Sequence, residues 1–140
     1  MRLNMSHQVR EEFLAGLHVA VLSVASQDGG GPLAVPVWYT YSPGGTVNVI
    51  TGRGTRKAAA IMAAGRFSLC AQDERPPYKY VTVEGPVAIE GATQAERLDL
   101  AHRYLGPQGG DAYIAANPGG DWIMLRMTPE HWLAVDYSMG

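Results

Sequence analysis

The sequence predicts a mainly β protein with short helices (an α+β fold), built around one small, closed antiparallel sheet. About six segments alternate apolar and polar residues with a period of two, as half-buried strands do. Short connections rich in Gly and Pro, such as residues 28–32 and 42–45, favour antiparallel neighbours. Helices do not regularly separate the strands, which disfavours a doubly wound parallel sheet.

The composition limits the possible classes of protein. A chain of 140 residues with 46% hydrophobic residues is long and apolar enough for one packed domain spanning residues 1–140. The net charge of −2 argues against a general nucleic-acid binder. No apolar run reaches the ~18 residues of a membrane span. The segment Met1–His7 lacks the apolar stretch of a signal peptide, so we expect a cytoplasmic protein with no membrane partner.

In the first half of the chain, Ser6 is a candidate N-cap for a helix over residues 6–15, before a strand over 17–26. A return strand follows over 33–41. Its odd positions face the core and leave Pro36 and Trp38 on the other face. A third strand covers 46–51, and the short turns predict that the three strands form an antiparallel meander. Because Pro36 has no N–H to donate, it marks a sheet edge or a place where the backbone meets a ligand.

The second half predicts three helices and four strands. Thr55 caps a helix over 56–64, which Gly65 ends, and strands follow over 66–72 and 78–89. Gly85-Pro86 interrupts the second of these strands, which indicates a bulge or an edge. A capping-box pattern at 93–96 opens a helix to about residue 105, and a short helix covers 111–116. Strands over 122–127 and 132–136 complete the chain. The inward positions of the capped helix are Leu98, Ala101, Tyr104 and Leu105.

Three cations, Arg53, Arg56 and Lys57, lie at the start of the helix over 56–64. A helix N-terminus already carries partial positive charge, so each cation there costs a few tenths to ~1 kcal/mol. The cations at this helix start are explained if an anion binds there and accepts hydrogen bonds from the hydroxyl groups of Thr51 and Thr55. The sequence therefore predicts a phosphate site. The alternative is a solvated helix start whose cations pair with nearby acids.

Other segments are weaker candidates. The aromatic strand around Trp38 would fit along a flat ring, or it is ordinary core packing at a sheet edge. Tyr78 and Lys79 would reach a substrate, or they are plain strand surface. The histidines match no metal-ligand spacing, Cys70 is expected to be an unreactive core thiol, and no nucleophile elbow is present. With catalytic residues unknown, we expect a cofactor to carry any chemistry.

The order of these segments resembles a known family. It comprises Pro36-Val37-Trp38, then the run 50–57 with its glycines and cations, then 65–70 and Tyr80–Gly85. Together they resemble the pyridoxamine-phosphate-oxidase-like split β-barrel family, and within it the flavin/deazaflavin oxidoreductases that use coenzyme F420. The resemblance implies a six-stranded antiparallel split β-barrel of the FMN-binding type. It also implies a homodimer with the cofactor in a groove at the subunit interface.

The resemblance also implies roles for individual residues. The cofactor phosphate would be held by Arg53, Thr55, Arg56 and Lys57, and Thr51 would line the approach. The ring would be bordered by Val35, Pro36, Val37 and Trp38. Tyr78, Lys79 and Tyr80 would approach from the neighbouring subunit or shape the substrate side.

The resemblance favours one reaction and leaves two alternatives. The chain lacks the Arg-Leu tail of true pyridoxamine phosphate oxidases, which argues against vitamin B6 oxidation. The adjacent Arg56-Lys57 pair is more similar to the F420 branch than to the FMN branch. We therefore expect an F420-dependent oxidoreductase that transfers a hydride to or from a flat, conjugated small molecule. The alternatives are an FMN-dependent oxidase or reductase and a non-catalytic F420- or flavin-binding protein.

Overall fold

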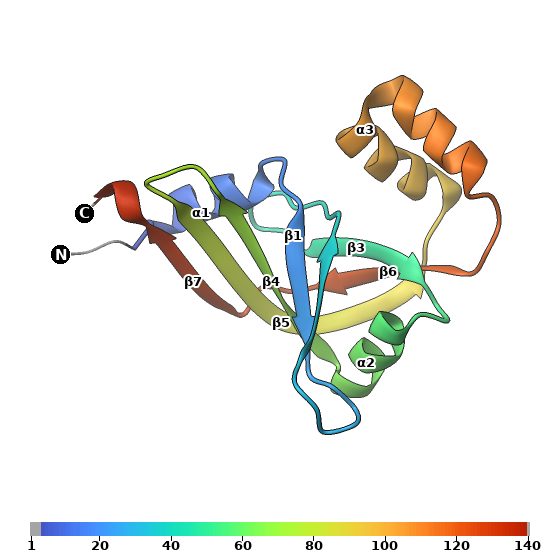
Figure 1. The fold of residues 1–140 in the computed structure, drawn as a ribbon, viewed down its shortest axis with the longest axis horizontal. Helices are drawn as coiled ribbons and strands as arrows, with labels where there is room; N and C mark the ends of the chain where they lie inside the picture. Colours follow the sequence, from blue (N-terminus) through green and yellow to red (C-terminus); the bar gives the residue numbers. More distant parts are fainter. Residues whose placement is uncertain (1–3, 140) are drawn as a thin grey trace.

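The computed structural model describes residues 4–139 as a curved antiparallel sheet covered by helices (Figure 1). Residues 1–3 of the N-terminal segment and Gly140 lie outside the described residues. The helices are α1 (His7–Ala15), α2 (Arg56–Ala64), α3 (Gln94–Ala116) and a closing 3-10 turn (Tyr137–Met139). The strands are β1 (Ala20–Val24), β2 (Leu33–Val37), β3 (Val47–Gly52), β4 (Arg66–Asp73), β5 (Lys79–Gly91), β6 (Trp122–Met127) and β7 (His131–Asp136).

The sheet confirms the predicted mainly β fold of the split-barrel type. Its strand order is β2-β1-β4-β5-β6-β3, and β7 pairs with β5 beside this path. Thr40 and Asn48 form an antiparallel bridge, with N···O distances of 3.0 and 2.9 Å. This bridge joins the segment after β2 to β3, so the two ends of the six-strand order meet. Among residues 4–139 there are thus six barrel strands, as the resemblance implied, and a seventh strand, β7, which lies where the sequence predicted a last strand over 132–136.

The predicted three-strand meander is wrong at its third strand. β1 pairs with β2, but β3 pairs along its whole length with β6, from Val47↔Met127 to Gly52↔Trp122. β2 ends at Val37, and the segment after it meets β3 only at the Thr40–Asn48 bridge. In the same segment the N–H of Tyr39 donates to the hydroxyl of Tyr104 at 3.0 Å, so a side chain of α3 takes the next position of the β1–β2 ladder.

The longest strand, β5, runs through both halves of the barrel (Figure 1). Its first part pairs with β4 and β7, and its second part pairs with β6. The change of partner falls at Gly85-Pro86, where a Cβ on Gly85 would lie 1.8 Å from the carbonyl oxygen of Thr128. The sequence predicted a bulge or an edge at Gly85-Pro86. The edge is wrong, because β5 has β4 on one side and β6 and β7 on the other, and the interruption is this change of partner. The glycine is needed because another backbone approaches it closely.

The core fills the inside of the curved sheet. Its largest fully buried side chains include Tyr39, Phe67, Leu14, Leu22, Ile61, Leu69, Ile123 and Leu125. α1 closes one end of the core, where the hydroxyl of Tyr39 donates to the carbonyl of Leu14 at 2.6 Å. The odd positions of β2 and the segment after it pack inward as predicted. Cys70 does not belong to this core: it is half-exposed on the outer face of β4, because Leu69 and Ala71 take the inward positions.

The three predicted N-caps are present, and the first is Ser6, whose side chain accepts from the N–H of Val9. The Thr55 hydroxyl accepts from the N–H of Ala58, and Gly65 ends α2 with φ 73°. α3 opens with the predicted capping box and bends sharply at Gly106 (φ 78°), so that its halves fold back on each other (Figure 1). The second half runs to Ala116 and begins well before residue 111. None of the helices within residues 4–139 combines the length and apolarity needed to cross a membrane.

The predicted inward face of α3 is only partly right. Ala101 is buried and Tyr104 packs against the barrel, but Leu105 is exposed. Arg97 and Leu100 are buried in its place. The inward stripe is therefore rotated toward residues that the hydrophobic pattern alone did not identify.

Gly85→Ala should destabilise the protein by roughly 1–3 kcal/mol, because the added methyl group overlaps the Thr128 carbonyl and forces backbone movement. Urea unfolding at constant m-value would measure this loss. Gly91→Ala is the matched control: it lies on the same strand, where a Cβ meets nothing within 4 Å. Equal stabilities of the two variants would contradict the close approach.

Candidate functional site

A pocket of about 310 Å³ lies between the barrel and α3, at the end where β3 stops and β6 begins. This volume is at the lower end of the range for small-molecule sites, roughly 300–1,000 Å³. Its walls are mostly apolar and aromatic, and its lining includes two cations and no carboxylate. The lining residues are Val19, Pro36, Val37, Trp38, Ile50, Lys57, Arg97, Leu100, Tyr113, Ile114 and Trp122.

Trp38 forms a flat wall because α3 holds its indole ring. The ring stacks on Tyr104, with centroids 5.0 Å apart and planes 6° apart, and Tyr113 lies against it at 5.3 Å. The Tyr104 hydroxyl donates to the carbonyl of His18 at 2.6 Å and accepts from the N–H of Tyr39 at 3.0 Å. It therefore stands between the start of β1 and the segment after β2. One side chain both docks α3 and fixes the position of Trp38.

Lys57 supplies a positive charge to the pocket from the first turn of α2. It is half-buried, and burial alone lowers the pKa of its ammonium group. Among residues 4–139 no acidic side chain lies within 4 Å of it. A partly desolvated cation at a helix N-terminus favours an anionic ligand. This arrangement is what the phosphate-site prediction requires of one of its three cations.

Arg97 brings a second cation from the first half of α3. Its side chain is 9% exposed, its guanidinium lies 4.2 Å from the ring centre of Trp122, and its Nη2 donates to the carbonyl of Asn117 at 2.8 Å. Sequence reasoning missed this residue and the remaining pocket walls, which are Val19, Ile50, Leu100, Tyr113, Ile114 and Trp122. A signal was present: Arg97 precedes Leu100, Ala101 and Tyr104 at helical spacing.

Three other predicted phosphate ligands already have partners. Thr51 is buried, and its hydroxyl lies 3.2 Å from that of Thr55. The Thr55 hydroxyl also donates to the carbonyl of Gly52 at 2.9 Å while it caps α2. Arg53 pairs with Asp121 at 2.7 Å, with both side chains well exposed. The alternative of cations paired with nearby acids therefore describes Arg53, and the two threonines shape the turn that presents Lys57.

The other predicted site residues lie elsewhere in the chain. Arg56 lines a separate hollow with Ser26 and Asp28, and Val35 packs against the core. Tyr78 and Lys79 line a third hollow, at the start of β5. Within one chain, the structure brings Pro36, Val37, Trp38 and Lys57 together in the pocket and leaves Arg56, Tyr78 and Lys79 outside it.

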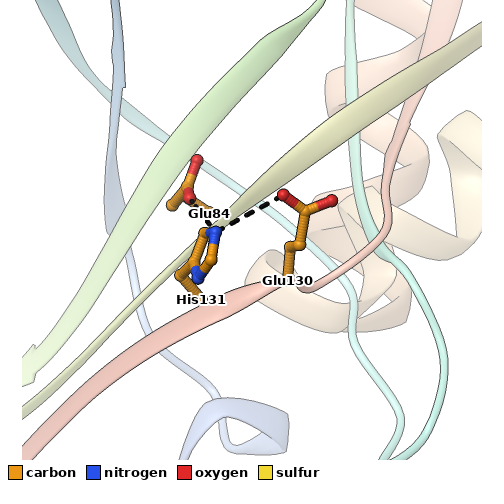
Figure 2. A group of neighbouring side chains, drawn as sticks. All are labelled: Glu84, Glu130 and His131. Atoms are coloured by element: carbon orange, nitrogen blue, oxygen red, sulfur yellow. Dashed lines mark ion pairs between the residues drawn. The ribbon is translucent and has the colours of Figure 1, made fainter.

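Glu84, Glu130 and His131 form a further polar cluster on the outer face of the sheet (Figure 2). One ligand atom from each lies within 4.8 Å of the others, which is compact enough for a metal ion. Arg66, however, donates to Glu84 at 2.8 Å and to Glu130 at 3.1 Å. The guanidinium already pairs with both carboxylates, so the cluster ties β4, β5 and the start of β7 together as an ion-pair network.

Comparison with known proteins identifies the family. A family model described as pyridoxamine 5'-phosphate oxidase matches residues 6–136, and the chain belongs to this family. No curated protein matches the sequence.

Solved structures share the fold at low identity. A conserved hypothetical protein from Mycobacterium tuberculosis has a TM-score of 0.78 and 19% identity, over 96% of this chain and 87% of that one. An F420 reductase has a TM-score of 0.71 and 22% identity, over 88% and 94%. A FAD-binding protein from Mesorhizobium loti has a TM-score of 0.66 and 19% identity, over 94% and 93%.

Tyr104→Phe should lower the unfolding free energy by roughly 1–2 kcal/mol, because the His18 carbonyl and Tyr39 N–H lose a shared partner. Chemical denaturation would measure the loss, and amide hydrogen exchange should become faster across α3. Tyr113→Phe is the control on the same helix, since its exposed ring also contacts Trp38, at 5.3 Å and with a tilt of 51°. If both variants keep wild-type stability, the Tyr104 hydroxyl does not hold α3 in place.

Proposed function

We propose that this protein is an F420-dependent oxidoreductase that transfers a hydride between the deazaflavin cofactor and a flat, conjugated small molecule. One observation carries the proposal: Lys57, half-buried at the start of α2 without an acidic partner, lines the same pocket as the flat wall of Pro36 and Trp38. A phosphate-bearing cofactor with a planar ring matches both features. Family membership and the likeness to an F420 reductase support the choice.

The residues of the pocket have definable roles in such a reaction. Lys57 would bind the cofactor phosphate, with support from the α2 N-terminus. Trp38, held by Tyr104, would fix the plane of the ring, and the apolar side chains Leu100 and Ile114 would exclude water. A deazaflavin or flavin bound there supplies the hydride-transfer chemistry. The described residues of the lining include no carboxylate or imidazole, and the role proposed for them is binding and orientation.

An FMN-dependent oxidoreductase is the second candidate. The family description and the likeness to a FAD-binding protein favour a flavin. Parallel titration of F420 and FMN into cofactor-free protein distinguishes the two by affinity. Turnover of a quinone or enone acceptor with the reduced cofactor then separates an oxidoreductase from a binding protein that only stores or senses the cofactor.

Lys57→Ala should weaken binding of the preferred cofactor by roughly 1–3 kcal/mol, the range for a lost charge-assisted hydrogen bond. Arg56→Ala should cost less, because Arg56 lines a different hollow. Arg75→Ala is the control, since its side chain is 86% exposed and lies outside the pocket. Wild-type affinity in the Lys57 variant for both F420 and FMN would rule out the phosphate site.

The affinity should also depend on pH through Lys57. Burial lowers the pKa of the Lys57 ammonium group below the ~10.4 of a free lysine. The group therefore loses its proton at a lower pH than free lysine does, and the bound phosphate then loses its positively charged partner. Affinity should therefore fall as the pH rises through that lowered pKa. In Lys57→Arg the charge persists, and the decline between pH 7 and 10.5 should disappear.

We further propose a homodimer, with the cofactor groove completed by the second subunit. The outer face of the sheet supports it: one row across the strands comprises Pro36, Val21, Cys70, Thr82 and Leu133, all of them uncharged. Val21 and Leu133 are 43% and 55% exposed in a single chain. An exposed uncharged face of this kind is typical of a protein–protein contact. Tyr78 and Lys79 would reach a cofactor only in such an assembly.

Light scattering should report twice the 15.0-kDa mass of the chain at micromolar concentration. Val21→Lys should shift the protein toward monomer, because it places a charge in the middle of the uncharged row. Met62→Lys is the control at matched exposure (44%) on α2. A wild-type monomer that binds the cofactor with full affinity would contradict the shared groove.

A further inference from the structure

Arg97 is not explained by phosphate binding at Lys57. Its side chain is more than nine-tenths buried and lines the pocket. Among residues 4–139, no carboxylate lies within 4 Å of its guanidinium. Its contacts are the Asn117 carbonyl, through Nη2, and the face of Trp122. The hydrogen bond uses one of five N–H donors, so most of the donor set remains for a ligand.

A buried guanidinium without a counter-charge is an unfavourable arrangement. Arginine keeps its charge at all accessible pH values, and buried charges in proteins are normally paired. The surroundings provide no anion, because the neighbouring pocket walls from α3 are Leu100, Tyr113 and Ile114. A bound molecule that carries negative charge would supply the missing partner. The aromatic walls indicate that this molecule is planar, and the fork of N–H donors fits a carboxylate or phosphate.

We propose that Arg97 binds an anionic group, a carboxylate or phosphate, on the planar ligand that fills this pocket, and that it thereby selects acidic aromatic molecules as substrates. This deepens the proposed function and rests on it in one respect: the substrate is taken to share the pocket with the cofactor ring. Lys57 and Arg97 come from different helices, α2 and α3. The pocket thus offers separate positions for two anionic groups.

The test is the binding of two matched probes, 2-naphthoate and 2-naphthamide, to cofactor-free protein by isothermal titration calorimetry. The probes share a ring system and differ in charge. Wild-type protein should prefer naphthoate by about ten- to a hundredfold, the size of one charge-assisted interaction. Arg97→Gln should remove this preference, and Arg97→Lys should retain part of it. The control Arg10→Gln, on α1 beside a different hollow, should leave it unchanged.

Further arms identify the anion position and its source. A preference that is lost in Lys57→Gln but kept in Arg97→Gln would overturn the proposal, as would equal binding of both probes by wild-type protein. The second outcome does not depend on how well any variant folds. If FMN-loaded protein still prefers naphthoate, the anion belongs to the substrate. If FMN displaces naphthoate and binds less tightly to Arg97→Gln, the anion belongs to the cofactor, and Arg97 is still its binding residue.

The same design separates this proposal from the proposed function. Protein that binds neither F420 nor FMN but retains an Arg97-dependent preference for naphthoate would contradict the oxidoreductase and leave the anion site standing. Protein that binds a cofactor through Lys57 but shows no such preference would support the oxidoreductase and contradict the anion site at Arg97.

Discussion

The architecture depends on the close approach of two backbones at Gly85. Because residue 85 has no side chain, the Thr128 carbonyl reaches the middle of β5, and Thr128 and Glu130 donate their N–H groups to the carbonyls of Pro86 and Glu84. One continuous strand can therefore pair with β7 in its first part and β6 in its second. Through β6 this contact also positions β3, the turn after it and the start of α2. The placement of Lys57 thus depends on a backbone contact between β5 and the segment after β6.

A second contact, made by the Tyr104 hydroxyl, forms the pocket between the barrel and α3. Ordinary strand pairing of β1 and β2 would continue past Ala20↔Val37, but the Tyr104 hydroxyl takes the next ladder position between His18 and Tyr39. The two strands separate, and α3 is fixed at the opening. Since α3 bends at Gly106, its second half returns to place Tyr113 against Trp38. The pocket is therefore formed by contacts between segments about 65 residues or more apart in the sequence.

Features that depend on neighbouring residues could be predicted from the sequence, and features that depend on contacts between distant segments could not. Alternating residues and caps depend on neighbours in the chain, so the strands, the Thr55 cap, the end of the first half of α3 near residue 105 and the family followed from the sequence. The pairing of β3 with β6 and the docking of Tyr104 are long-range, and the short turns pointed to the wrong neighbour. Arg97 was missed for a different reason: it occupies an inward position of α3, but a charged residue counts as polar in a hydrophobic pattern. The roles of Tyr78 and Lys79 depend on a second subunit and stay predictions.

The positive charges of the pocket follow the pattern noted in the sequence, in which cations lie at the start of a helix. Lys57 is in the first turn of α2, and Arg97 is the fourth residue of α3, so each cation stands near the positive end of a helix. A like charge there costs roughly 0.3–1 kcal/mol at an exposed site, and partial burial removes the water that would screen it. Lys57 and Arg97 both line one pocket, and no described lining residue carries a carboxylate. The two cations therefore repel each other until an anion binds. The stability given up in the ligand-free protein is therefore available as binding energy for a ligand that carries negative charge.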